Sequence, residues 1–363
     1  MYIRRGSFSE QKEKELVMKK KVLIVALSAV MAIGMSVGLT GCGSGSSSGG
    51  SGKTVTLHFA SSQGTTHVWY KEAKKFKENV EKDSDGTIKV ALEFGGVDGS
   101  DKDTAEGVQS GTIDMYIGST VGFDTSVPKI GFVNLPYFIN SYDKVDKLIY
   151  NGWVGETIKK DAEDAGFKIL GLTDCDFRWL STKKKLVKSA ADLKGLKMRV
   201  PESPMFVNFF KNMGAKPTTM AFTEVPSALQ QGTIDGQDNG PTLSYPNGLQ
   251  QFNKYWVKSN HSFASAVVAM NPDSWSKLSK DQQEVLQKNV DEYCENIKTG
   301  LRAEVKEDEK KMVEEDNCKV IEPTAQLKAD MKKAAYKVWQ DKKVTKTFDQ
   351  DAVKRMLKEA GLN

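Results

Sequence analysis

Arg199 is the residue whose position best suits ligand chemistry, because it ends a short apolar segment two residues before Pro201. A guanidinium on a rigid strand end can hold a carboxylate through two parallel hydrogen bonds, which the ammonium of a lysine cannot do. The same spacing also fits a solvated arginine at the end of a surface strand. The local pattern therefore indicates a candidate carboxylate site and leaves the surface interpretation open.

Residues suited to catalysis are scarce in this chain. It has three histidines, and His58 alternates with apolar residues on the polar side of an expected strand. His67 falls in the first turn of an expected helix, so both histidines suit structural or solvated roles better than proton transfer. No His/Cys/Asp spacing resembles a zinc site, and no nucleophile elbow or P-loop follows a strand. We expect no catalytic residue, no metal and no cofactor; a surface hydrolase is the enzyme alternative.

The N-terminal region has the composition of an export signal. Three lysines at 19–21 precede an apolar run at 22–39, and no second run of membrane-spanning length follows. Leu39-Thr40-Gly41-Cys42 resembles a bacterial lipobox, and a Ser/Gly-rich stretch comes next. We expect residues 1–41 to be a signal peptide whose true start is Met18. Cys42 would then carry the lipid, residues 42–52 would form the tether, and the protein would lie outside the cytoplasm, anchored to the cell membrane.

The positive charge of the chain belongs mostly to this leader. The net charge is +5, and residues 1–41 carry seven Lys or Arg against three Asp or Glu. The remainder is therefore close to neutral. Phosphate binding requires clustered cations in surplus, so the composition predicts no nucleic-acid partner.

The elements that must position Arg199 follow an alternating pattern of strands and helices. Residues 55–59 and 88–94 alternate apolar with polar side chains, while apolar residues at helical spacing lie at 69–80 between them. This order predicts an α/β fold. Ser279 followed by Gln282 is a capping box that predicts the start of a long helix.

One hexapeptide pattern occurs twice. Residues 109–114 read QSGTID and residues 230–235 read QQGTID. In each copy a helix is expected to end at the glycine and a strand to follow. The repeat indicates either two lobes of similar construction or a common connector that recurs by chance.

Three segments around Arg199 resemble a known family. They read LKGLKMRVP at 193–201, GAKPTTMAFTEV at 214–225 and ALQQGTIDGQDN at 228–239. Their order and spacing resemble those of the DctP family, the solute-binding proteins of TRAP (tripartite ATP-independent periplasmic) transporters. The match extends over most of 55–275, with the stretch 193–239 as its most specific part.

The resemblance implies a two-lobed periplasmic-binding-protein-like fold with a hinge and a long helix that spans both lobes. We expect lobe I to contain residues 53–175 plus about 264–303. Lobe II would contain residues 176–263 plus about 304–363. A crevice between two lobes is a usual site for a small ligand.

The resemblance also implies the ligand contacts. Arg199 occupies the place of the selectivity arginine, Arg178 that of a second arginine, Asn239 that of an asparagine donor and Phe222 that of a lining aromatic residue. The positions that resemble first-lobe contacts are Ser62, Gln63 and Ser119. They are uncharged, which favours hydroxylated or keto monoacids, or dicarboxylates bound by both arginines. Gly240 and Pro226 depart from the family pattern, which usually has proline and often tyrosine there.

The implied function is capture of a small organic acid by closure of the lobes. Delivery would follow to a TRAP permease made of two integral membrane subunits. A binding protein that serves an ABC-type transporter or a sensory system is the alternative with the same fold.

Overall fold

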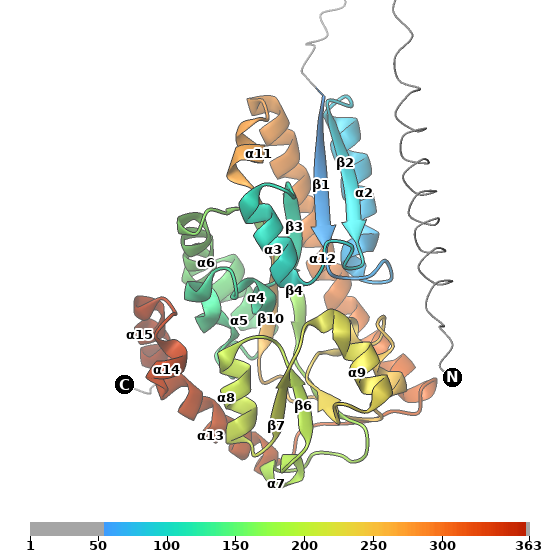
Figure 1. Ribbon diagram of the computed structural model, residues 1–363, viewed down its shortest axis with the longest axis vertical. Helices are drawn as coiled ribbons and strands as arrows, with labels where there is room; N and C mark the ends of the chain where they lie inside the picture. Colours follow the sequence, from blue (N-terminus) through green and yellow to red (C-terminus); the bar gives the residue numbers. More distant parts are fainter. Residues whose placement is uncertain (1–53, 361–363) are drawn as a thin grey trace, which may run out of the picture. The chain divides into compact units, whose positions relative to one another are not determined.

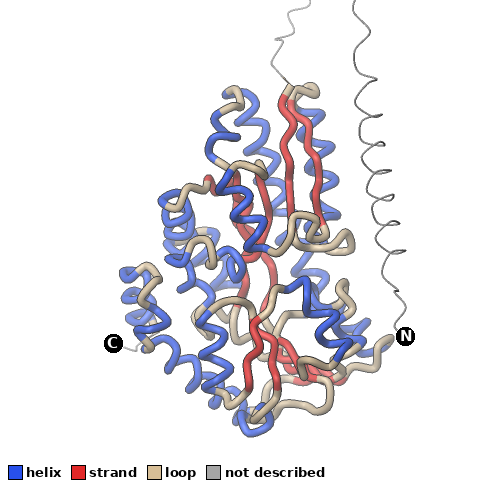
Figure 2. Tube along the Cα trace, in the orientation of Figure 1, coloured by secondary structure: helices blue, strands red, loops and turns tan. Residues whose placement is uncertain are grey.

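The computed structural model describes residues 54–360, which form two β-sheets with helices around them (Figure 1, Figure 2). The predicted signal peptide 1–41, the lipidation site Cys42 and the tether 42–52 lie outside the described residues. Within residues 54–360, no helix combines the length and the apolar character that a membrane span requires. The described part is thus a mixed α/β fold, as the alternation of strand and helix patterns predicted.

The first sheet has five strands in the order β2-β1-β3-β10-β4. Strand β1 runs parallel to β2 and β3, whereas β10 is antiparallel to β3 and β4. The strands are β1 (Val55–Ser61), β2 (Ile88–Phe94), β3 (Met115–Ser119), β4 (Lys168–Phe177) and β10 (Phe263–Met270).

The second sheet has six short strands in the order β11-β9-β5-β8-β6-β7. Strand β6, which carries Arg199, lies between β7 and β8 and runs parallel to both. The strands are β5 (Leu180–Thr182), β6 (Lys197–Val200), β7 (Lys216–Thr219), β8 (Gly236–Gln237), β9 (Tyr255–Val257) and β11 (Lys319–Ile321).

Helices accompany both sheets. Those between the strands of the first sheet are α2 (Val68–Asp83), α3 (Asp101–Ser110), α4 (Thr120–Phe123), the 3-10 helix η1 (Pro128–Asn134), α5 (Tyr142–Val145), the π-helix η2 (Asp146–Tyr150) and α6 (Trp153–Asp164). Those between the strands of the second sheet are α7 (Ala190–Leu193), α8 (Pro204–Asn212), η3 (Phe222–Glu224), α9 (Val225–Gln231), α10 (Pro241–Ser244) and η4 (Leu249–Gln251). The C-terminal helices are α11 (Pro272–Ser276), α12 (Lys280–Glu314), α13 (Ala325–Gln340), α14 (Lys342–Thr345) and α15 (Gln350–Glu359). We call each sheet with the helices between its strands a lobe, the first and the second in chain order.

The long helix α12 begins as the sequence predicted and connects the two lobes. Ser279 is its N-cap, and the reciprocal hydrogen bonds with Gln282 complete the capping box. Over its length α12 packs against α2 and β4 of the first lobe and against α10 and β11 of the second. The chain also crosses between the sheets after β4 and again before β10. The expected two-lobed fold with a lobe-spanning helix is confirmed.

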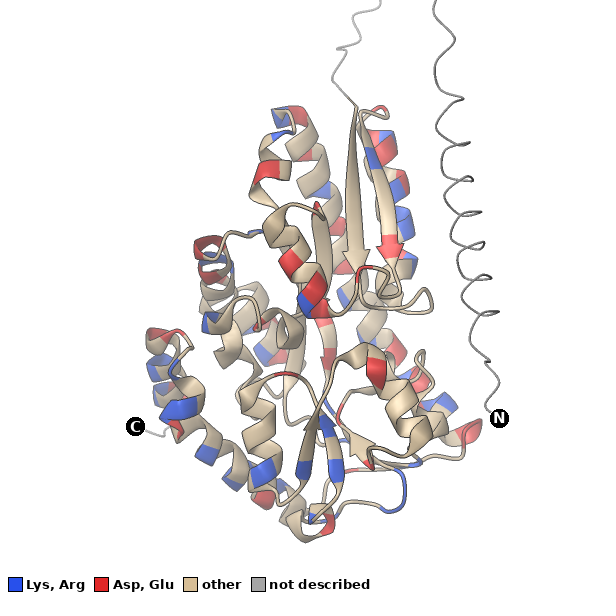
Figure 3. Cartoon of the chain, in the orientation of Figure 1, with Lys and Arg blue, Asp and Glu red and all other residues tan. Residues whose placement is uncertain are grey.

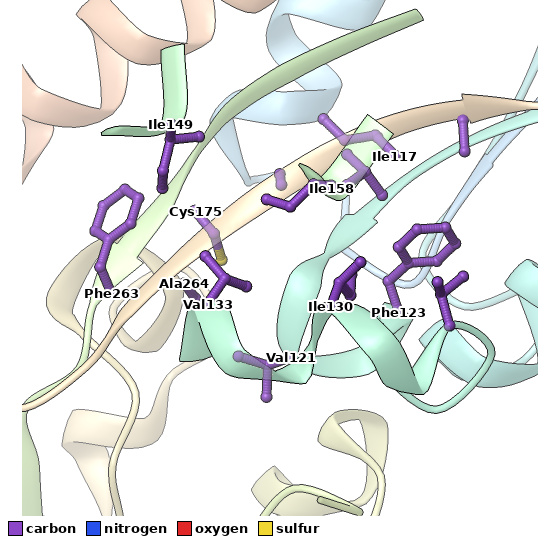
Figure 4. Close-up of a cluster of buried hydrophobic side chains, with 14 of the residues drawn as sticks. Ile117, Val121, Phe123, Ile130, Val133, Ile149, Ile158, Cys175, Phe263 and Ala264 are labelled. Atoms are coloured by element: carbon purple, nitrogen blue, oxygen red, sulfur yellow. The ribbon is translucent and has the colours of Figure 1, made fainter. Parts of the chain in front are cut away.

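The core of the first lobe fills both faces of its sheet. Phe59 of β1 packs edge-on against Phe76 of α2 and Tyr293 of α12, with ring centroids 5.5 and 5.7 Å apart. Ile117 and Phe263 belong to another part of the buried cluster, which Figure 4 shows in close-up. Burial of this apolar surface holds the strands of the first sheet in place, including the strand ends that lie near the second lobe.

The repeated hexapeptide adopts the same conformation twice. Gly111 ends α3 with φ 77° and Gly232 ends α9 with φ 71°, both in the left-handed region that favours glycine. The Asp114 carboxylate then accepts a hydrogen bond from the His58 amide at 2.8 Å, and Asp235 accepts one from the Lys197 amide at 2.9 Å. Each copy ties its connector to a neighbouring strand, β1 or β6, so the two lobes share this unit.

The last helices contact both lobes. Helix α13 packs on α8 of the second lobe, whereas the Asp349 amide donates to the Lys129 carbonyl of the first lobe at 2.9 Å. Lys and Arg alternate with Asp and Glu along helices such as α2 and do not gather on it by sign (Figure 3). This mixture agrees with the near-neutral charge calculated for the part of the chain that follows the leader.

Candidate ligand-binding site

A cavity lies between the two lobes, where strand ends of both sheets meet. All seven residues predicted to contact a ligand line it: Ser62, Gln63, Ser119, Arg178, Arg199, Phe222 and Asn239. They come from positions far apart in the sequence, and the fold brings them together. Their role in binding remains a prediction, but their common location is a property of the structure.

Arg199 presents a buried positive charge to this cavity. It is 3% exposed, and its Nε and Nη2 atoms donate to the Met220 carbonyl at 3.2 and 2.9 Å. The ring centroid of Phe222 lies 6.0 Å from its Cζ atom. Burial, together with the charge of Arg178, lowers the pKa of Arg199 to about 10, so it stays protonated at neutral pH. These partners are neutral, and among residues 54–360 no carboxylate forms a direct ion pair with Arg199, although Asp238, Asp101 and Glu202 lie close enough to act on its pKa.

Arg178, in contrast, already has a carboxylate partner. Its Nε and Nη2 atoms donate to the two oxygens of Asp238 at 3.0 and 2.5 Å, and its guanidinium lies 4.7 Å from the ring centroid of Phe206. His261 Nε2 lies 3.2 Å from the same carboxylate, and its ring stacks on Phe209. Burial alone would raise the pKa of Asp238, but Arg178 and His261 hold it below its usual range. Arg178 is thus held by an internal ion pair at the cavity wall.

Two buried amides face the cavity with unused hydrogen-bonding capacity. Gln63 and Asn239 are 3% and 2% exposed, and among the described residues neither Gln63 Oε1 nor Asn239 Nδ2 has a hydrogen-bond partner. A buried polar atom without a partner costs free energy that a bound ligand can recover. Ser119 caps α4 through its hydroxyl, which accepts from the Val121 amide at 3.1 Å.

Asp101 is a cavity residue that the sequence did not single out. It is the first residue of α3, and one carboxylate oxygen accepts from the Ser62 hydroxyl at 2.5 Å. Burial raises its pKa, while the bond from Ser62 and the charge of Arg199 oppose that shift. In the sequence it reads as an ordinary acidic residue in a first helical turn. Its only signal in the sequence was its position directly after Ser100, the N-cap of α3.

The departure from the family pattern at Gly240 has a steric reason. A Cβ atom at this position would lie 2.2 Å from Asp176 Oδ2 and 2.3 Å from the Phe177 carbonyl oxygen. Asp176 accepts hydrogen bonds from the Thr242 amide and hydroxyl at 3.0 and 2.6 Å. The loop after Asn239 therefore closes around a buried carboxylate and needs a residue without a side chain.

The remaining histidines are placed much as the sequence suggested. His58 is on the surface and contacts Glu93 at 2.8 Å. His67 is the N-cap of α2, one position before the predicted first turn, and burial lowers its pKa to about 3. Among residues 54–360, no group of three His, Cys, Asp or Glu side chains is arranged to hold a metal.

Comparison with known proteins decides the family. Residues 59–346 match the family described as DctP, bacterial extracellular solute-binding protein, family 7. This chain belongs to that family. DctP-family relatives include a solute-binding protein of Verminephrobacter eiseniae, 32% identical over 66% of this chain and 70% of the relative. Another is the C4-dicarboxylate-binding periplasmic protein DctP of Rhodobacter capsulatus, 30% identical over 61% of this chain and 66% of the relative.

Solved structures show the same DctP fold. The sugar acid binding protein DctPAm of Advenella mimigardefordensis, solved in complex with galactonate, has a TM-score of 0.79 at 23% identity and covers 85% of this chain and 98% of its own. A TRAP periplasmic solute-binding protein of Sulfurospirillum deleyianum with bound succinate has a TM-score of 0.77 at 25% identity, covering 83% and 97%. The predicted family and two-lobed fold are both confirmed.

Proposed function

We propose that this DctP-family chain captures a small organic acid outside the cytoplasm and delivers it to a TRAP-type permease. One observation carries the proposal: Arg199 is a buried, charged guanidinium that faces a cavity and forms no direct ion pair among the described residues. Burying a charge is costly unless a partner offsets it. A ligand carboxylate is the partner that fits a guanidinium in geometry and charge.

Capture proceeds by closure of the two lobes around the acid. Arg199 and Asn239 lie in the second lobe, while Ser62, Gln63 and Ser119 lie in the first, so a ligand that contacts both sets favours the closed form. Closure removes water, which strengthens the pairing between the carboxylate and Arg199. The moving units would be 53–175 with about 264–303 and 176–263 with about 304–363.

The ligands named for relatives support an acid as the cargo. The binding proteins mentioned above were solved with galactonate or succinate. A TRAP binding protein of Bordetella, 28% identical with a TM-score of 0.74, has density assigned to pantoate. All three molecules are small carboxylates.

The location and partners follow from the family and from the leader. The signal peptide 1–41 would direct export, and lipid on Cys42 would hold the protein at the cell membrane through the tether 42–52. Two integral permease subunits would receive the ligand. The protein would bind its ligand without transforming it, since the polar groups of the cavity are suited to recognising an acid.

Replacement of Arg199 by alanine tests this function. We expect Arg199→Ala to lose about 3–5 kcal/mol of binding free energy, which is about a hundred-fold to several thousand-fold in affinity, because the ligand carboxylate would be buried without its partner. A thermal-shift screen of the wild-type protein against four-carbon, keto, aromatic and sugar acids would supply the ligand, since tight binding raises Tm. Arg355→Ala is the matched control, because that side chain is 55% exposed on α15. Binding by Arg199→Ala within tenfold of wild type would contradict the proposal.

A further inference from the structure

We infer that the acid selected by this site is a hydroxylated monocarboxylate and that Asp101 selects it by accepting a ligand hydroxyl opposite Arg199. This inference rests on the proposed function and narrows its substrate class. It follows from the placement of Asp101, from the polarity of the cavity and from the internal pairing of Arg178.

The absence of a side chain at residue 122 leaves space for the Asp101 carboxylate in the cavity wall. Asp101 opens α3 directly after the N-cap Ser100, and its side chain lies between Ser62 and Gly122. A Cβ atom on residue 122 would come within 2.5 Å of Asp101 Cβ and 2.8 Å of its Oδ2. Glycine at 122 therefore admits a carboxylate that any larger residue would displace.

Each lobe contributes a charged group and an unpaired amide atom to the cavity. The second lobe contributes the guanidinium of Arg199 and the free amide nitrogen of Asn239. The first lobe contributes the Asp101 carboxylate and the free Oε1 of Gln63. A ligand that satisfies both sides accepts hydrogen bonds at one end and donates them at the other, as a hydroxy acid does.

A second ligand carboxylate would meet negative charge from both lobes. Asp101 lines the cavity from the first lobe and Glu202 from the second, whereas Arg178 is already paired with Asp238. Lys102 also lines the cavity, but its side chain is 49% exposed and its Nζ atom lies 3.8 Å from Glu106 Oε1. A dicarboxylate would bind only with Asp101 protonated, which costs free energy above the pKa of that group.

A hydroxyl also fits better than an ammonium. Burial raises the pKa of Asp101, which works against the ionised form that an ammonium requires. Either protonation state of a carboxyl group can accept a hydrogen bond from a hydroxyl. The charge of Arg199, which acts on Asp101, would in addition repel a cationic group placed beside that carboxylate.

Four-carbon acids of matched size test the inference by titration calorimetry on the wild-type protein. Erythronate carries hydroxyls, butanoate has none, succinate has a second carboxylate and 4-aminobutanoate has an ammonium. We expect erythronate to bind at least about tenfold more tightly than each of the others, because an analogue that lacks the hydroxyl leaves buried acceptors unpaired. Tighter binding of succinate or 4-aminobutanoate would overturn the inference while leaving organic-acid capture intact.

The variant Asp101→Ala assigns the selectivity to this residue. We expect the ratio of erythronate affinity to butanoate affinity to fall about tenfold, because the substitution removes the acceptor that the ligand hydroxyl requires. Glu106→Gln is the control on the same helix, since that carboxylate is 57% exposed. An unchanged preference in folded Asp101→Ala would overturn the role of Asp101. If wild type binds no carboxylate of any class, the proposed function itself fails.

Discussion

At the scale of single residues, Asp238 is a buried carboxylate held between two cationic or polar partners. It is completely buried and contacts both Arg178 and His261, which are also buried. Removing one member of such a group leaves the others without compensation, which costs more than the pair itself contributes to stability. Asp238 therefore fixes the orientation of Arg178 at the cavity wall.

The substitution Asp238→Asn tests this view of the ion pair. We expect it to lower the free energy of unfolding by about 3 kcal/mol, because the Arg178 guanidinium would remain buried without a counterion. Urea unfolding followed by fluorescence measures the change. Asp351→Asn is the control, since that side chain is 93% exposed and surface pairs contribute less than about 1 kcal/mol. Equal stabilities of the two variants would contradict the prediction.

Cavity residues could be located from the sequence where a local motif carried the information. Arg199 and Asn239 were located through segments whose order resembles the family, and both line the cavity. The pairing of Arg178 with Asp238 joins positions 60 residues apart, and no spacing rule predicts it. The same holds for Asp101, whose contact with Ser62 depends on how α3 packs beside the end of β1.

At the scale of elements, the loop between β8 and α10 depends on Gly240. We expect Gly240→Ala to destabilise the protein by at least about 2 kcal/mol, because its Cβ would clash with backbone at Phe177 and with the buried Asp176. Thermal unfolding of the purified variant measures this loss. Gly64→Ala is the control, since the nearest atom to its Cβ would be 3.9 Å away. A Gly240→Ala protein with the Tm of the control would refute the steric explanation.

Elements with strong periodicity were predictable, whereas short or irregular ones were not. Strands β1 and β2 and helix α2 follow the expected alternation, and the capping box places the start of α12 correctly. Strand β8 has no such signal, because it contains only two residues. Strands this short are defined by their neighbours, because β8 pairs with β5 and β6 from distant parts of the chain.

At the scale of the whole molecule, a contact between the lobes involves a titratable group. Asp124 follows α4 in the first lobe, and it accepts hydrogen bonds from Asn134 Nδ2 at 3.2 Å and from the Ser203 hydroxyl of the second lobe at 3.3 Å. Burial raises its pKa to about 7. Lys102 and Glu202 line the neighbouring cleft, together with Val344 and Phe348 of the C-terminal segment. Opening of the lobes would expose Asp124 to water.

Ligand affinity should therefore depend on pH through Asp124. In the closed form its pKa is about 7, and in the open form it would return toward the ordinary value of 3.8. Closure then takes up a proton between these values, so the closed form loses stability as pH rises through 7. We expect affinity to fall about tenfold from pH 6 to pH 8. Calorimetry at both pH values measures the change, and Asp124→Asn should abolish it.

The control for this pH dependence is Asp164→Asn, a first-lobe carboxylate that is 54% exposed and should leave the pH profile as in wild type. Proton uptake supplies a second, independent readout, because binding heats measured in buffers of different ionisation enthalpy report the number of protons bound on closure. We expect uptake of close to one proton near pH 6 in the wild-type protein and almost none in Asp124→Asn. Retention of the pH profile by Asp124→Asn would assign it to another buried carboxylate, such as Asp176 or Asp101, since burial raises the pKa of both.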